Sequence, residues 1–173
     1  MKDREPRIVP NVMGEGAPKI LGTVAKHPHL LKPMLEFSAA LASGVLPRRE
    51  SEILALRAAW NCRSDFEWGH HSRYGLAAGL TQEEIDRLAG GAAGESWNAA
   101  DAALVRAADE LHHDQDLSEA TWAALAETWD EAQLIEIPFV VGQYTMLSMV
   151  AKATTVPVDD DLPAFPGGAV EPR

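Results

Sequence analysis

The sequence is poor in cysteine and in positive charge, and each shortage excludes a class of protein. Its 173 residues include one cysteine, Cys62, which excludes an intramolecular disulfide, a CxxC redox pair and a cysteine-rich zinc site. Lysine and arginine number 15 against 26 aspartates and glutamates, for a formal net charge of −11. A nucleic-acid-binding protein would normally show a basic patch. None is visible, so we expect no nucleic-acid partner.

Long apolar runs are also missing. No stretch approaches the roughly 20 uninterrupted apolar residues that a membrane-spanning helix needs. The N-terminal sequence MKDREPRIVPNV lacks the apolar core of a secretory signal. We therefore expect a cytoplasmic protein without a membrane partner. The 46% apolar content and the length are typical of one globular domain with a sizeable core.

Helix signals dominate the sequence, and no convincing run of alternating β-branched residues is present. Helices are predicted over 19–26 (ended by Pro28), 29–43, near 47 through 60, 65–78, 82–89, and from Asn98 or Asp101 through 111, with two more after the N-caps Ser118 and Asp130. Thr81–Glu84 and Asp130–Gln133 have the pattern of capping boxes. The glycine-rich stretch 90–94 is predicted to be a loop. The fold prediction is an all-α domain of seven or eight helices.

The last predicted helix is apolar around most of its circumference. It runs from Asp130 to about Lys152, and this pattern predicts a central helix or one buried between subunits. Pro138 is expected to kink it or to lie where a neighbour satisfies the freed carbonyl. We divide the chain into an N-terminal arm (1–17), a helical domain (18–154) and a proline-rich tail (155–173), either disordered or wrapped around a partner subunit.

An acid and an imidazole share one face of the predicted helix 65–78. Glu67 and His71 are four residues apart, so they lie one turn apart on the same side. Because buried charge is costly unless paired, we expect them to satisfy each other or a neighbour. Glu52 lies at the edge of a packing stripe on the preceding helix. An antiparallel helix pair joined near Cys62 would bring Glu52 to this strip.

These candidates also have structural interpretations. Glu67 and His71 could be an ion pair that orders a helix contact, and Glu52 could pair on the surface with Arg48 or Arg49. Ser64 is more simply a helix N-cap than a nucleophile.

The remaining candidates have similar alternatives. His70 is either a solvent-facing neighbour or a member of the site, and Trp60 and Trp68 are core or pocket walls. Cys62 is most simply a small buried hydrophobe. His112, His113 and Asp114 suggest a metal site, but adjacent histidines on a helix point about 100° apart. Their place at a helix C-terminus complements the helix dipole, so we expect no metal.

The spacing of Glu52, Ser64, Glu67 and His71 resembles the alkylhydroperoxidase-D/carboxymuconolactone decarboxylase superfamily. Eleven, two and three residues separate them, and the redox branch has glutamate, a CxxC pair and histidine at these positions. The segments LPRRESEILALRAAW, DFEWGHHSRYGLAAGLTQEEI and QLIEIPFVVGQYTMLSMV resemble the decarboxylase-like branch, and the similarity covers roughly residues 20–155. Serine and glutamate at the thiol positions cannot replace the thiolate that attacks a peroxide or the second thiol that resolves the oxidised cysteine. We therefore expect no thiol peroxidase activity.

The resemblance implies a fold, an assembly and a reaction. It implies an alkylhydroperoxidase-D-like helical array that forms a homo-oligomer, a trimer or hexamer. It also implies a cofactor-independent lyase or isomerase acting on a small carbonyl or lactone acid. The expected catalytic residues are Glu52, Glu67 and His71, with His71 supplying a proton to the enolate that remains after loss of CO₂. The expected substrate contacts share the same pair of helices: Ser64, Trp68, His70 and Trp60.

Two questions stay open at this stage. Arg63 or Arg73 could supply positive charge for a substrate carboxylate, but spacing does not place either one in a pocket. The alternative function is a non-catalytic oligomer that binds a small ligand and has lost the family's redox chemistry.

Overall fold

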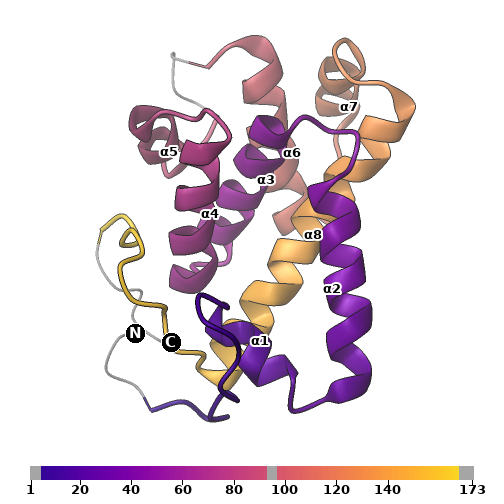
Figure 1. The fold of residues 1–173 in the computed structure, drawn as a ribbon. Helices are drawn as coiled ribbons and strands as arrows, with labels where there is room; N and C mark the ends of the chain where they lie inside the picture. The colour runs from indigo at the N-terminus through magenta and orange to yellow at the C-terminus, as the bar shows by residue number, and fades with distance from the viewer. Residues whose placement is uncertain (1–4, 93–96, 168–173) are drawn as a thin grey trace.

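The computed structural model describes residues 5–92 and 97–167, and these residues form eight α-helices and no strand. The helices are α1 (Lys19–Val24), α2 (Pro28–Ala42), α3 (Arg48–Asn61), α4 (Asp65–Ala77), α5 (Gln82–Leu88), α6 (Ala99–His113), α7 (Glu119–Ala126) and α8 (Glu131–Thr154) (Figure 1). The predicted all-α fold is confirmed. Of the predicted loop 90–94, residues 93 and 94 lie outside the described residues.

Side-chain caps begin the later helices where the sequence predicted them. The capping boxes that start at Thr81 and Asp130 both form, and Ser118 caps α7. At the start of α6, Asn98 is the cap, because its side chain accepts a hydrogen bond from the Asp101 N–H at 2.8 Å.

One predicted boundary was wrong. Pro28 does not end the first helix, since α1 already ends at Val24, and Pro28 is instead the first residue of α2. Proline suits that position because its fixed φ is helical and its missing N–H would have no partner in the first turn.

Helix α3 is the centre of the fold and positions the rest. It packs against α4, α6 and α8, and every residue from 51 to 56 is buried. The turn at 62–64 folds α4 back along α3, which makes the two helices an antiparallel pair (Figure 1). Arg63 reverses the chain there with a φ of 51°. Facing side chains of α3 and α4 can therefore meet in the interior.

Helix α8 is buried on one side and open on the other. Its inner side contributes Leu134, Ile137 and Val140 to the core, and the helix continues through Pro138 without a break. Length and mean hydropathy alone would let α8 cross a bilayer, but half of its most apolar window is buried, as in a core helix. Helix α2 lies beside α8 and has no fully buried residue.

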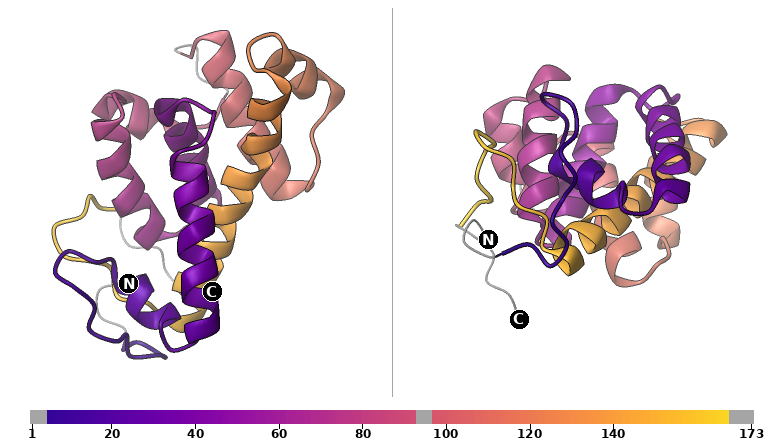
Figure 2. Two further views of the ribbon diagram at one scale, coloured as in Figure 1. Left: turned by 45° about the vertical axis from the view of Figure 1, so that its right-hand side comes forward. Right: turned by 60° about the horizontal axis from the view of Figure 1, so that its bottom comes forward.

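The described segments before α1 and after α8 lie together on one side of the molecule (Figure 2). Of the predicted tail, residues 168–173 lie outside the described residues, and the part that the structure describes packs on its own chain. Phe165 stacks on the Trp60 ring at 4.9 Å between centroids and meets Trp68 edge-on at 5.5 Å. Leu162 lies against Gly69, where an added Cβ would come within 2.9 Å of the Leu162 Cβ. Only glycine at position 69 lets the tail approach α4 so closely.

We expect Phe165→Ala to lower the free energy of unfolding by about 3 kcal/mol, because the ring is 8% exposed and fills a space between two tryptophans. Urea unfolding followed by tryptophan fluorescence measures this loss. The control is Val12→Ala, at a fully exposed side chain, where we expect a change below about 0.5 kcal/mol. Equal stability of the two variants would mean that the tail packing contributes nothing.

Candidate active site

The α3–α4 pair brings the three predicted catalytic residues together in the interior. Ser64 caps α4 by accepting a hydrogen bond from the Glu67 N–H at 3.4 Å, and this starts the helix that presents Glu67 and His71 on one face. Glu52 faces them from α3. The exposed fractions are 1% for Glu52, 3% for Glu67 and 4% for His71. Burial of all three in one place is unusual, because ionisable groups are rarely buried without partners.

The imidazole of His71 lies between two carboxylates. Its Nδ1 is 2.7 Å from Glu52 Oε2, and its Nε2 is 3.6 Å from Glu67 Oε2. Glu52 also forms an ion pair with Arg48, one turn earlier on α3. Because a carboxylate paired with an arginine only accepts hydrogen bonds, Nδ1–H of His71 donates to Glu52 and Nε2 is left facing Glu67. We call these four residues the acid–imidazole cluster.

Glu67 has an unusual protonation equilibrium. Burial raises its pKa to about 7, against the opposing effect of positive charge on His71. Its Oε1 is buried and has no hydrogen-bond partner among the residues that the structure describes. Glu67 therefore exchanges a proton near neutral pH, which is the property required of a general acid or base.

Two tyrosines border the cluster. The Tyr74 and Tyr144 rings both meet His71 edge-on, at 5.5 Å and 4.1 Å between centroids. Burial raises the pKa of each phenol, and the negative charge of Glu52 raises it further. The side chain of Arg48 is 38% exposed and Tyr74 is 39% exposed, so these two side chains reach the surface next to the cluster.

The predicted substrate contacts do not all reach this cluster. Ser64 is fully buried as a cap, and Trp60 and Trp68 hold Phe165 of the tail. His70 lies on the other flank of α4, with its Nε2 2.8 Å from Asp159 Oδ2. The structure therefore groups Trp60, Trp68 and His70 with the tail.

The arginines considered for substrate binding lie elsewhere. Arg63 is exposed in the α3–α4 turn, and Arg73 donates to the Asp161 carbonyl in the tail. The cation at the cluster is Arg48, which was considered only as a surface partner for Glu52. Its spacing of four residues from Glu52 was the available signal, and the burial of Glu52 was the missing fact.

The lone cysteine lies next to a histidine rather than in a metal site. Cys62 Sγ is 3.9 Å from His112 Nδ1, and burial raises the pKa of the thiol. The side chain is half-buried rather than buried. His112 and His113 pack edge to face at the end of α6. Among the described residues, no three His, Cys, Asp or Glu side chains are grouped to hold a metal ion.

Comparisons with known proteins connect this fold and site to a family. Residues 28–110 match the profile of the carboxymuconolactone decarboxylase family, and this range contains the whole acid–imidazole cluster. Among curated protein sequences, none matches the chain.

Several solved structures share the fold at low sequence identity. A protein of unknown function from Agrobacterium tumefaciens, described as a candidate antioxidant defence protein AhpD, has a TM-score of 0.74 and 14% identity over 80% of this chain and 96% of its own. An uncharacterised peroxidase-related protein from Silicibacter sp. TM1040 has a TM-score of 0.75 and 16% identity, over 83% and 78% of the two chains.

A third similar structure is the debrominase Bmp8 in complex with 2,3,4-tribromopyrrole, with a TM-score of 0.69 and 15% identity over 83% of this chain and 78% of its own. At these identities the likeness concerns the fold, which is that of the AhpD proteins. Residues 28–110, just under half of the chain, therefore resemble the carboxymuconolactone decarboxylase family, and with one cysteine the chain has no CxxC pair.

Proposed function

We propose that the protein is a cofactor-independent lyase or isomerase that acts by acid–base chemistry on a small carbonyl or lactone acid. The observation that supports this most directly is the position of His71 between Glu52 and Glu67, with a Glu67 pKa of about 7. A general acid or base is most effective when its pKa is close to the working pH.

The cluster supplies the proton that such a reaction needs. When a β-keto acid loses CO₂, the electron pair of the broken C–C bond moves into an enolate, and one proton must then be added to carbon. The Glu67–His71 pair delivers this proton from the Glu67 carboxyl or from His71 Nε2, and solvent restores it. Glu52 and Arg48 hold the imidazole in one orientation through Nδ1.

The residues present argue against peroxide reduction. A dithiol peroxidase needs one thiolate to attack and a second thiol to resolve the sulfenic acid. The chain has one cysteine, and burial raises the pKa of that thiol. The single cysteine therefore favours acid–base over thiol chemistry, although peroxidase-related proteins share the fold.

Incubation of the purified protein with a panel of β-keto acids and lactone acids tests the proposal. Mass spectrometry should show a product that has lost CO₂, or an isomer separated by chromatography, at a rate above a control without protein. Saturable binding of a panel member without any conversion would contradict the lyase proposal and would favour the non-catalytic ligand-binding protein.

We also propose that the protein acts as a homo-oligomer. A groove of about 330 Å³ between α2 and α8 is lined by Phe37, Pro138, Phe139, Gly142, Gln143 and Met146. On α8, the side chains of Ile135 and Met149 are 61% and 65% exposed. An apolar face of this kind is typical of a subunit contact.

We expect light scattering to give the mass of a trimer or hexamer. The double variant Phe139→Asp/Met146→Asp should give a monomer mass, because two charges in the groove cannot be buried in a contact. Leu76→Asp, at an exposed apolar residue on α4, is the matched control and should keep the wild-type mass. A wild-type protein with the mass of one chain would contradict the proposal.

A further inference from the structure

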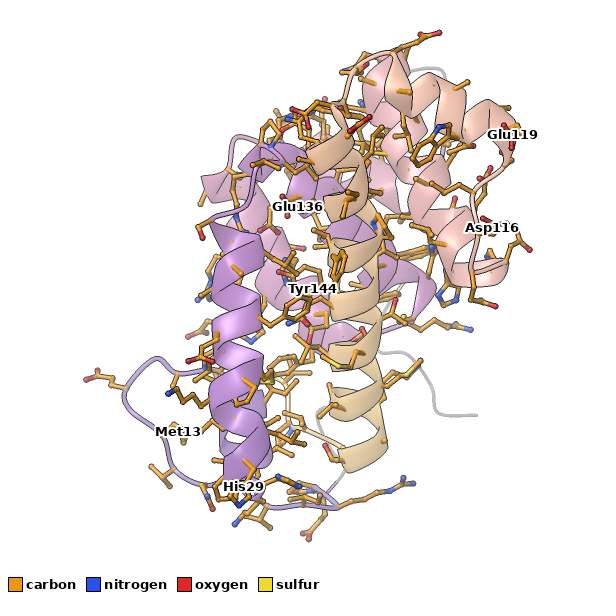
Figure 3. The ribbon with its side chains drawn as sticks, turned by 90° about the vertical axis from the view of Figure 1, so that its right-hand side faces the viewer. Met13, His29, Asp116, Glu119, Glu136 and Tyr144 are labelled. Atoms are coloured by element: carbon orange, nitrogen blue, oxygen red, sulfur yellow. The ribbon has the colours of Figure 1, made fainter. Side chains whose placement is uncertain are left out.

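One side chain at the acid–imidazole cluster has no part in the proton transfer described above. Tyr144 lies near the middle of α8, between α2 and α8 in Figure 3. Its ring meets that of His71 at 4.1 Å between centroids, with 68° between the ring planes. Within residues 5–92 and 97–167 no hydrogen bond holds its hydroxyl. A hydroxyl beside the reacting groups is therefore available to a ligand.

The hydroxyl keeps its proton at neutral pH. Burial raises the pKa of the Tyr144 phenol above its ordinary value, and the negative charge of Glu52 acts in the same direction. A protonated phenol is a hydrogen-bond donor. Tyr144 can therefore donate to a ligand oxygen without giving up its proton.

The charges around Tyr144 permit a negatively charged ligand. The ionisable side chains that act on it are Arg48 and Glu52 on α3, and Glu67 and Tyr74 on α4. Arg48 neutralises Glu52 through their ion pair. Glu67 carries no charge while it holds its proton, which burial favours. An oxyanion beside Tyr144 is therefore not opposed by a net negative charge, despite the −11 of the whole chain.

We propose that Tyr144 is a further catalytic residue, whose hydroxyl donates a hydrogen bond to the substrate oxygen that becomes the enolate. This inference rests on the proposed lyase or isomerase function. As the electron pair of the broken bond moves into the substrate, negative charge develops on the carbonyl oxygen. A donor already fixed in place stabilises that charge without reorganisation. Tyr144 keeps its proton, and Glu67–His71 delivers the proton to carbon.

The first test compares Tyr144→Phe with Thr154→Val, which removes a hydroxyl at the far end of the same helix. Phenylalanine keeps the ring contact with His71, so the fold and the position of the imidazole are preserved. We expect kcat of Tyr144→Phe to fall by about 10- to 100-fold while KM changes by less than about twofold, because the bond strengthens in the transition state. Thr154→Val removes a hydroxyl that donates to the Val150 carbonyl of its own helix, and we expect kcat to change by less than about twofold. An unchanged kcat in Tyr144→Phe overturns the proposal.

The second test separates this inference from the proposed function. 4-Nitrophenol is the probe, since its coloured phenolate is a stable analogue of an enolate oxygen. We expect the wild-type protein to bind the phenolate, and Tyr144→Phe to bind it at least about tenfold more weakly. If no acid is converted but this difference is found, the lyase proposal fails and the oxyanion site at Tyr144 stands. Equal binding by both proteins, or no binding by the wild type, overturns the inference.

Discussion

Glu67→Gln is expected to lower turnover at pH 7 by about 10²- to 10⁴-fold, which is the range for loss of a general acid or base. Glutamine has nearly the shape of glutamate and can remain buried beneath His71, but it cannot gain or lose a proton near neutral pH. The Oε2 that lies 3.6 Å from His71 Nε2 then no longer shares a proton with the imidazole. Steady-state rates on any acid that the protein converts measure the effect.

The matched control for this prediction is Glu136→Gln. Glu136 is also a buried glutamate, 8% exposed, but it lies on α8 and accepts a hydrogen bond from the Val45 N–H at 2.7 Å (Figure 3). The same chemical change there should leave turnover within about twofold of the wild type. Wild-type turnover in Glu67→Gln would remove Glu67 from the chemistry. Equal losses in both variants would assign the effect to folding.

Local signals explain which parts of the fold could be predicted from the sequence. The caps at Thr81, Ser118 and Asp130 act within three residues of each helix start, so the sequence contains both partners of each contact. The Glu52–His71 contact is also nearly local. Because the chain reverses near Cys62, midway between the two residues, an antiparallel pair must bring them to the same level.

The features that the sequence did not predict depend on long-range packing. Tyr144 is 73 positions after His71 in the chain, and no periodicity within α8 indicates which turn of the helix faces the site. Trp60 and Trp68 were considered as core or pocket walls and as substrate contacts, and in the structure both rings contact Phe165 of the tail. The prolines predicted an extended tail, but the sequence did not indicate which surface the tail covers.

We expect the free energy of unfolding of the wild type to fall between pH 5 and pH 8. The fall should be about 3 kcal/mol larger than in Glu67→Gln. The pKa of Glu67 is about 7 in the folded protein against an ordinary value of 4.5, so the folded state binds the proton more tightly than the unfolded state. The stabilisation is complete below the unfolded pKa and is lost as the pH rises through the folded pKa. Each unit of difference corresponds to about 1.4 kcal/mol.

Urea unfolding curves at fixed protein concentration measure this difference, with concentration held constant because an oligomer's stability depends on it. Glu84→Gln is the control, since its carboxylate behaves in the opposite way. Although burial acts to raise the pKa of Glu84, hydrogen bonds from Thr81 and Arg49 hold it below its ordinary value. Its contribution is present above the unfolded pKa and is lost only in acid, so Glu84→Gln should parallel the wild type between pH 5 and pH 8. If Glu67→Gln also parallels the wild type there, Glu67 titrates in the folded protein as it does in the unfolded chain, and the pair with His71 cannot hold an exchangeable proton near neutral pH.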